Sequence, residues 1–260
     1  TRPDLATITN VLAKYQSNPT QQHIDSAKFV IKYIKGTKDM GITFDTIADI
    51  NLTSFIHFPI KSNKITGICD ANWGPQDQSV PNSSRPKHDL DLFKTRSISG
   101  HLITLHGPLH WVSKRQKVTA RSSCEAEIYA TDECVKDILH LRNIIQDLKL
   151  QDELLTSKTI IYNDNMACVQ WSKSMTTKGL RHMQIRENGV RENKNILDIQ
   201  HVEGRRNPAD IFSKEDKDQN HFITLRNSIL HKPIDTSLTG ITAKTVILTK
   251  IEKPIEMNAS

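Results

Sequence analysis

Four acidic residues stand next to predicted strands and helices, where their carboxylates could act together. Asp70 follows the predicted strand KITGIC, and Asp164 follows the predicted strand TIIYN. Asp210 lies in the motif N-P-A-D at the start of a predicted helix, and Glu127 lies one turn into another. Taken singly, an Asp at a strand end is usually a turn residue, and an Asp in a first helical turn usually complements the helix dipole.

The chemistry of these four residues depends on whether the fold brings them together. Four carboxylates at one edge of a sheet repel one another unless cations are bound. Oxygen ligands that leave coordination positions open for water and phosphate suit a hard divalent metal such as Mg²⁺. Two such ions about 4 Å apart can align an attacking water and a leaving oxygen on a phosphodiester. A converging set would therefore predict metal-dependent phosphodiester hydrolysis.

The predicted helix over residues 122–148 determines which of its acids face the sheet. Its apolar stripe recurs at spacings of four and three and consists of Cys134, Ile138, Leu141, Ile145 and Leu148. Glu127 lies seven residues before this stripe and on the same face. Glu125 lies about 200° away and forms the capping-box pattern S-x-x-E with Ser122, whereas Asp132, about 140° from Glu127, is predicted to face solvent. Helix geometry alone leaves two alternatives for Glu127, a functional inward acid or a partly exposed residue near the helix start.

The other predicted elements form a mixed α/β sheet flanked by helices. Strands are predicted at 64–73, 97–107, 108–117, 157–165 and 195–204. Helices are predicted at 5–15, 19–37, 165–173, 180–193 and from 208 onward. Residues 41–62 are predicted to form a strand pair or a connector, residues 74–96 an exposed loop, and residues 231–260 a tail. The order of three strands, helix, strand, helices, strand and helix indicates one mixed sheet with helices packed on it.

Composition places the chain among soluble globular proteins with a mild preference for polyanions. Its 260 residues are 37% hydrophobic and 25% charged, and no stretch approaches the roughly 18 apolar residues of a membrane span. The formal net charge is +6 and the pI is about 9.1. The four cysteines form no C-x-x-C pair, which favours neither a cysteine zinc site nor a disulfide framework and indicates a reduced intracellular compartment. The start, without Met or a signal peptide, suggests a piece of a larger polypeptide.

A basic segment precedes the helix that carries Glu127. It contains four positive charges and no acid, from Lys114, Arg115, Lys117 and Arg121. A solvated surface explains such a segment about as well as a nucleic-acid interface, but its position beside Glu127 favours contact with phosphates. Trp111 is predicted to be a core residue rather than a base-stacking platform, and Cys69 and Cys168 are predicted to be buried.

The motifs together resemble a known family. C-D-A-N-W, S-S-C-E-A-E, Y-N-D-N and N-P-A-D-I-F-S-K, in this order, are similar to the ribonuclease H domain at the C-terminal end of copia-type (Pseudoviridae) retrotransposon Gag-Pol polyproteins. The upstream segments T-R-P-D-L-A-T and H-I-D-S-A-K-F-V-I-K-Y-I-K-G-T resemble the end of that family's reverse transcriptase. The resemblance covers residues 1 to about 215. It implies three parts: the end of the reverse transcriptase (1–60), a ribonuclease H-like domain (61–218) with a five-stranded mixed sheet flanked by helices, and a C-terminal tail (219–260).

The resemblance also implies an activity and the residues that perform it. Asp70, Glu127, Asp164 and Asp210 match the family's four metal-binding and catalytic carboxylates. Asp70 would bridge two Mg²⁺ ions, with Mn²⁺ as a substitute; Glu127 and Asp164 would complete one metal site and Asp210 the other. The implied reaction is hydrolysis of the RNA strand of RNA–DNA hybrids during reverse transcription, with the rest of the reverse transcriptase polyprotein as partner and no membrane involved. The implied location is the cytoplasm, in a virus-like particle, and additionally the nucleus.

Some positions depart from the family pattern. Asn72 replaces the second Asp of the usual S-D-A-D-W motif, and Arg205 stands where cellular ribonucleases H carry a loop His. Arg205 cannot exchange a proton at neutral pH, so an auxiliary role there is in question. His182 is a second auxiliary candidate, with helix capping or packing as the alternative. Two other functions stay open: a degenerate or domesticated relic that binds nucleic acid or partners without cleavage, and an integrase-type strand transferase, which the fourth acid disfavours.

Overall fold

The computed structural model describes residues 1–44, 63–74, 96–173, 189–214 and 218–232. The predicted loop at 74–96, most of the predicted helix at 180–193 and the tail beyond 232 lie outside this part of the chain. The same holds for most of the predicted strand pair or connector at 41–62.

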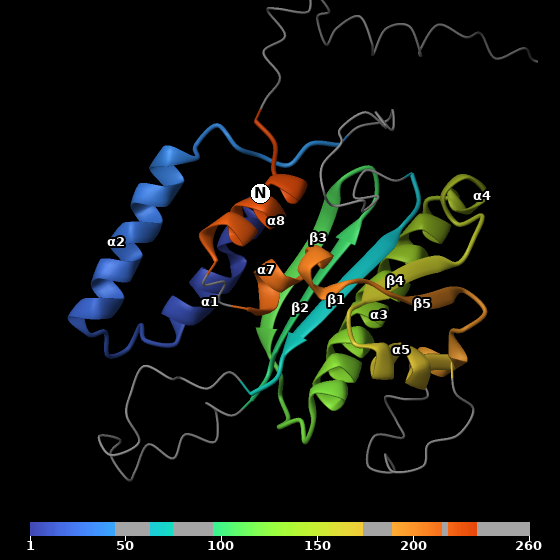
Figure 1. Cartoon of the computed structure of the whole chain (residues 1–260). Coiled ribbons are helices and arrows are strands. Elements are labelled where there is room, and N and C mark those ends of the chain that lie inside the picture. The colour runs from blue at the N-terminus through green and yellow to red at the C-terminus, as the bar shows by residue number, and fades with distance from the viewer. Residues whose placement is uncertain (45–62, 75–95, 174–188, 215–217, 233–260) are drawn as a thin grey trace, which may run out of the picture.

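A five-stranded mixed sheet forms the centre of the molecule (Figure 1). Its strands are β1 (Thr66–Asn72), β2 (Ile98–Thr104), β3 (Pro108–Arg115), β4 (Thr159–Asn163) and β5 (Leu197–His201). Their spatial order is β3-β2-β1-β4-β5; β1, β2 and β3 pair in antiparallel fashion, and β4 and β5 run parallel to β1. The predicted α/β class, a five-stranded mixed sheet flanked by helices, is confirmed.

The register of the two central strands brings two of the predicted acids together. Cys69 of β1 pairs with Asn163 of β4 in the parallel ladder, so the residues that follow them, Asp70 and Asp164, lie side by side at the carboxyl edge. Asp164 comes directly after β4, as predicted. The prediction that Asp70 follows its strand was wrong, because β1 continues through Asn72 by pairing with β2.

One face of the sheet is covered by α3 (Ser123–Asp147), with α5 (Met166–Lys173) and the short α4 (Gln151–Leu154) beside it (Figure 1). The core on this side includes Ile128, Ile138 and Ile161, which are almost completely buried. Gly67 permits this close packing, because a Cβ atom there would lie 2.7 Å from the Cδ1 atom of Ile138. The predicted helix over 122–148 is therefore confirmed, and it is fixed tightly against β1.

The opposite face carries α7 (Asp210–Ser213), α8 (Gln219–Ile229) and α1 (Ala6–Ala13), which follows the single turn η1 (Pro3–Leu5) (Figure 1). Phe212 is fully buried against β2, where a Cβ atom on Gly100 would lie 2.7 Å from the Cβ atom of Phe212. Thr7 of α1 donates a hydrogen bond of 2.6 Å to the carbonyl oxygen of Ile211. These contacts fix α7, and with it Asp210, above the middle of the sheet.

The helix predicted at 19–37 is present as α2 (Gln21–Gly36), which stands beside α1 and α8 rather than on the sheet (Figure 1). Residues 219–229 of the predicted tail form α8, which buries Leu225 and Ile229. The predicted limits of the three parts, 1–60, 61–218 and 219–260, stay predictions. Among the described residues, no helix combines the length and apolar character that a bilayer crossing requires.

Candidate metal centre

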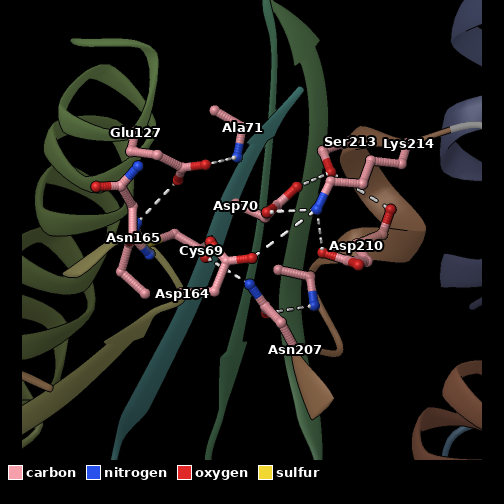
Figure 2. A network of polar contacts seen from close by, with 12 residues as sticks. Cys69, Asp70, Ala71, Glu127, Asp164, Asn165, Asn207, Asp210, Ser213 and Lys214 are labelled. Carbon is pink, nitrogen blue, oxygen red and sulfur yellow. Dashed lines mark hydrogen bonds and ion pairs between the residues drawn. The ribbon is translucent and has the colours of Figure 1, made fainter. Parts of the chain in front are cut away.

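Three of the four predicted acids meet at the carboxyl edge of the central strands. Asp70 comes from β1, Asp164 from the end of β4 and Asp210 from the first turn of α7. One carboxylate oxygen from each of the three lies within 4.8 Å of the others (Figure 2). We call these three residues the aspartate cluster. Asp70 is fully buried, and the other two side chains are 17% and 13% exposed. The cluster is therefore open to solvent on the side of Asp164 and Asp210.

A lysine that the sequence analysis did not single out lies inside this cluster. The Nζ atom of Lys214 is 2.8 Å from Asp210 Oδ1, 3.1 Å from Asp70 Oδ1 and 3.9 Å from Asp164 Oδ2 (Figure 2). Ser213, also unpredicted, donates its hydroxyl hydrogen to Asp70. The spacing of four residues between Asp210 and Lys214 was the available signal, since residues at that spacing share a helix face.

The acids of the cluster are difficult to ionise together. Burial and, after it, the charge of Asp70 raise the pKa of Asp210 to about 8, although Lys214 opposes the increase. Burial also raises the pKa of Asp164, again with a contribution from Asp70. One ammonium group therefore leaves negative charge uncompensated in a site made of oxygen ligands. This donor set and charge fit a hard divalent cation such as Mg²⁺.

Glu127 faces the sheet as predicted but lies outside the aspartate cluster (Figure 2). Its Oε1 atom accepts a hydrogen bond of 3.1 Å from the backbone N–H of Ala71, and its Oε2 atom accepts one of 2.9 Å from Asn163 Nδ2. Burial raises its pKa well above the usual value, and the charges of Asp70 and Asp164 add to the increase. Glu127 is thus attached to the residue after Asp70 and the residue before Asp164, while its role as a metal ligand stays a prediction.

Two asparagines support the site and were not predicted individually. Asn163 holds Glu127, as described above. Asn207 donates a hydrogen bond from Nδ2 to the carbonyl oxygen of Cys69 and accepts one at Oδ1 from the backbone N–H of Ala209, at 3.1 and 3.0 Å. This connects the turn before Asp210 to the strand that carries Asp70. Both asparagines belong to quoted motifs, Y-N-D-N and N-P-A-D, but no periodicity indicates what they contact.

Glu125 and Asp132 of α3 have structural partners. Ser122 Oγ accepts a hydrogen bond of 3.1 Å from the backbone N–H of Glu125, which confirms Ser122 as the N-cap half of the predicted capping box. The Glu125 carboxylate accepts hydrogen bonds from the Arg121 backbone N–H and from the Tyr129 hydroxyl. The prediction that Asp132 faces solvent was wrong: it is 3% exposed and pairs with Lys136 at 2.6 Å. Gly189 lies against this side of the helix, since a Cβ atom on it would be 3.6 Å from Asp132 Oδ1.

The predicted nucleic-acid-binding residues lie at the end of β3 and in the segment that leads to α3. The side chains of Lys114, Lys117 and Arg121 are exposed, and Arg115 is half-buried. Lys114 lies 3.6 Å from Glu133 of α3. Their contact with nucleic acid stays a prediction. Trp111 packs against the core beneath α7, and Cys69 and Cys168 are buried, as predicted.

The two auxiliary candidates have different outcomes. His182 lies outside the described residues. Arg205 is exposed on the short turn η4 (Gly204–Arg206), which approaches the site through Gly204, where a Cβ atom would lie 3.2 Å from Asp164 Oδ2. His201, at the end of β5, also contacts the site, because its Nε2 atom lies 3.1 Å from the carbonyl oxygen of Asp164.

The sheet and the aspartate cluster were compared with those of known proteins. Among solved structures, LC11-RNase H1, isolated from compost by a metagenomic approach, is 16% identical; the match covers 58% of this chain and 94% of that one, with a TM-score of 0.41. No family model matches the chain.

Similarity to curated proteins extends over most of the chain. The retrovirus-related Pol polyprotein from transposon TNT 1-94 of Nicotiana tabacum is 26% identical over 82% of this chain and 14% of its own length. The transposon Ty1-DR1 Gag-Pol polyprotein of Saccharomyces cerevisiae is 24% identical over 82% of this chain and 11% of its length. Secreted RxLR effector protein 161 of Plasmopara viticola is 30% identical over 54% of this chain and 80% of its length. The chain is thus distantly similar to copia/Ty1 retrotransposon Pol polyproteins over most of its length, and it spans about one seventh of the length of the first of these.

Proposed function

We propose that this chain is a Mg²⁺-dependent ribonuclease H that hydrolyses the RNA strand of RNA–DNA hybrids during reverse transcription of a retrotransposon. The observation that supports this function is the aspartate cluster, in which three oxygen ligands from β1, β4 and α7 lie within 4.8 Å of one another. Mn²⁺ is the expected substitute for Mg²⁺. The rest of the reverse transcriptase polyprotein is the expected partner, in cytoplasmic virus-like particles and additionally in the nucleus.

In this proposal each acidic residue has a distinct task. When bound, two Mg²⁺ ions would supply an activated water and would stabilise the leaving oxygen of the phosphodiester. Asp70, buried at the centre of the cluster, would contribute to both metal positions, with Asp164 on one side and Asp210 on the other. Glu127 would complete the site of Asp164, and its hydrogen bonds to Ala71 and Asn163 would hold its carboxylate in a fixed orientation.

The proposed substrate selectivity rests on the nucleic acid's shape and sugar. An RNA–DNA hybrid presents 2′-hydroxyl groups on one strand only, and a protein distinguishes this strand by contacts to those groups and by groove shape. Lys114, Arg115, Lys117 and Arg121 would contribute phosphate contacts, which bind any strand and add affinity rather than selectivity.

The decisive assay uses the full chain with labelled RNA–DNA hybrid, RNA duplex and DNA duplex, in Mg²⁺ or in EDTA. We expect cleavage of the hybrid's RNA only, and only with metal. Glu127→Gln should abolish cleavage, whereas Glu125→Gln on the same helix should retain it. Equal loss in both variants, with both folded by circular dichroism, would contradict the assignment of Glu127.

A second function is favoured by one observation. Lys214 contacts all three aspartates, so its ammonium group already neutralises part of their negative charge. A relic that binds nucleic acid without cleaving it would keep such an arrangement. In that case the chain would bind the hybrid equally well in Mg²⁺ and in EDTA, and no added divalent ion would produce cleavage or raise the thermal stability.

A further inference from the structure

A second group of potential metal ligands lies on the other face of the sheet. His101 on β2, His110 on β3 and Asp137 on α3 each direct one ligand atom to a common point, and these atoms all lie within 4.8 Å of one another. His101 pairs with Cys69 in the ladder, one position away from the pairing of Gly100 with Asp70. Because successive side chains of a strand point to opposite faces, this group is on the α3 side, whereas Gly100 faces α7.

The distances between the ligand atoms of this group are close to those between the ligand atoms around a bound transition metal. The Nε2 atom of His101 lies 2.9 Å from Asp137 Oδ2, and the Nε2 atom of His110 lies 3.3 Å from the same oxygen. A tetrahedral zinc ion with ligands about 2.0–2.1 Å away separates its ligand atoms by roughly 3.3 Å. Both nitrogen–oxygen distances are therefore close to the separation that zinc requires, and the two imidazole nitrogens lie within 4.8 Å of each other.

The protein holds these ligands on regular elements rather than on loops. His101 is 1% exposed, and His110 pairs with Ile103 in the neighbouring strand. Side chains two positions apart on one strand share a face, so His110 lies diagonally beside His101. Asp137 is half exposed on α3, and its pKa is lowered, chiefly by the hydrogen bond with His101.

We propose that His101, His110 and Asp137 form a zinc site that is separate from the aspartate cluster. Imidazole nitrogen suits Zn²⁺, whereas the all-oxygen aspartate cluster suits Mg²⁺, so the two sites select different ions. The three ligands leave one tetrahedral position open. A cavity of about 180 Å³, lined by His110, Asp137 and apolar residues of β2 and α3, lies beside the site and gives that position room for water. The ion connects the edge strand β3 to α3.

The expected affinity follows from the surroundings of His101. Its Nδ1 atom is buried and has no hydrogen-bond partner among the described residues. Metal-binding histidines normally donate their second N–H to a carbonyl or carboxylate, and loss of such support weakens binding roughly 10–100-fold. We therefore expect micromolar rather than nanomolar binding of Zn²⁺.

The test titrates the metal-free full chain with Zn²⁺ in excess Mg²⁺, which occupies the aspartate cluster, against a chromogenic zinc chelator. We expect one Zn²⁺ per chain. Co²⁺ in its place should give the intense visible absorption of a tetrahedral site. His110→Ala and Asp137→Asn, both at partly exposed positions, should each weaken binding by more than the roughly tenfold that loss of a supporting hydrogen bond costs. His140→Ala, one turn along α3 at the rim of the same cavity, is the matched control and should bind as the unmodified chain does.

Two results would overturn the proposal. One is the absence of any stoichiometric zinc binding in excess Mg²⁺. The other is unchanged binding in both His110→Ala and Asp137→Asn, which would place the zinc elsewhere. Asp210→Asn separates this site from the aspartate cluster: it should leave zinc affinity unchanged, and a loss equal to that of the His110 variant would also overturn the assignment.

Discussion

Replacement of Asp210 by Asn should stabilise the metal-free protein while it removes the proposed activity. Asp210 is buried except for 13% of its side chain, and its pKa in the folded protein is about 8, compared with 3.8 for an unperturbed Asp. The folded protein therefore disfavours the ionised form that the unfolded chain adopts at neutral pH. Asn has nearly the same shape and carries no charge, so it avoids this cost.

The magnitude follows from the difference between the two pKa values. At pH 7, which is about 3 pH units above the ordinary pKa of 3.8, the folded protein holds Asp210 largely protonated. Protonation at that pH costs at most about 4 kcal/mol of folding free energy. Asn also loses the 2.8 Å ion pair with Lys214, whereas the 3.1 Å pair between Lys214 and Asp70 remains. A net gain of about 1–3 kcal/mol, or roughly 2–10 °C in Tm for a domain of this size, is expected.

The pH dependence has a defined sign. A carboxyl group with a raised folded-state pKa costs nothing below the unfolded value of 3.8, costs progressively more up to about pH 8, and is constant above that. The stability difference between Asp210→Asn and the unmodified chain should therefore be near zero at pH 4 and largest at pH 8.

The assay is thermal unfolding monitored by circular dichroism, in EDTA and in Mg²⁺, from pH 4 to 8. Mg²⁺ should raise the Tm of the unmodified chain but not that of Asp210→Asn, because the variant lacks one ligand. Lower Tm of the variant in EDTA at pH 8, or an equal response of both proteins to Mg²⁺, would refute the reasoning.

Three further predictions concern neighbouring features. Lys214→Met should destabilise the metal-free chain by about 1–3 kcal/mol, because the charged ammonium group, whose pKa is raised, stabilises the neighbouring carboxylates. The same variant should bind Mg²⁺ more tightly in calorimetry, because the ammonium group competes with the metal for these carboxylates; unchanged Mg²⁺ affinity would contradict this. Gly100→Ala should displace α7, since the new Cβ atom would lie 2.7 Å from that of Phe212, and hybrid cleavage should fall although circular dichroism still shows a folded chain. Lys117→Ala and Arg121→Ala should each lower the salt dependence of hybrid binding by about one unit in a log–log plot, measured by fluorescence anisotropy, and an unchanged slope would place them outside the interface.

The sequence patterns predicted where the helices and strands lie better than they predicted what packs against each of them. The strands were predictable because β-branched residues cluster between turn signals, and the long helix because its apolar residues recur at spacings of three and four. The helix at 21–36 was also predictable from its period, yet none of its residues is buried and Ile31 is 66% exposed. Periodicity shows that a face is apolar, but it does not show what, if anything, packs on that face.

The same limit explains the outcomes for the acids of α3. The prediction for Glu127 was correct in direction because the core stripe fixes which side of the helix meets the sheet. The prediction for Asp132 was wrong because the helix has a second buried side, next to Gly189, that no pattern within the helix reveals. A helical wheel assumes one buried face, and a helix with neighbours on two sides requires knowledge of the whole fold.

The charge balance of the site likewise arises only in three dimensions. Asp70, Asp164 and Asp210 come from positions far apart in the chain, and Lys214 reaches all three because α7 lies over the ends of β1 and β4. Three carboxylates contact this one ammonium group, and Glu127 lies nearby, outside the cluster. Burial raises the pKa values of Glu127, Asp164 and Asp210, and the negative charges of neighbouring acids add to the increase. The perturbed ionisation of these acids is therefore a property of the folded arrangement, and it makes the cluster compatible with a divalent cation, since each acid alone would ionise normally in water.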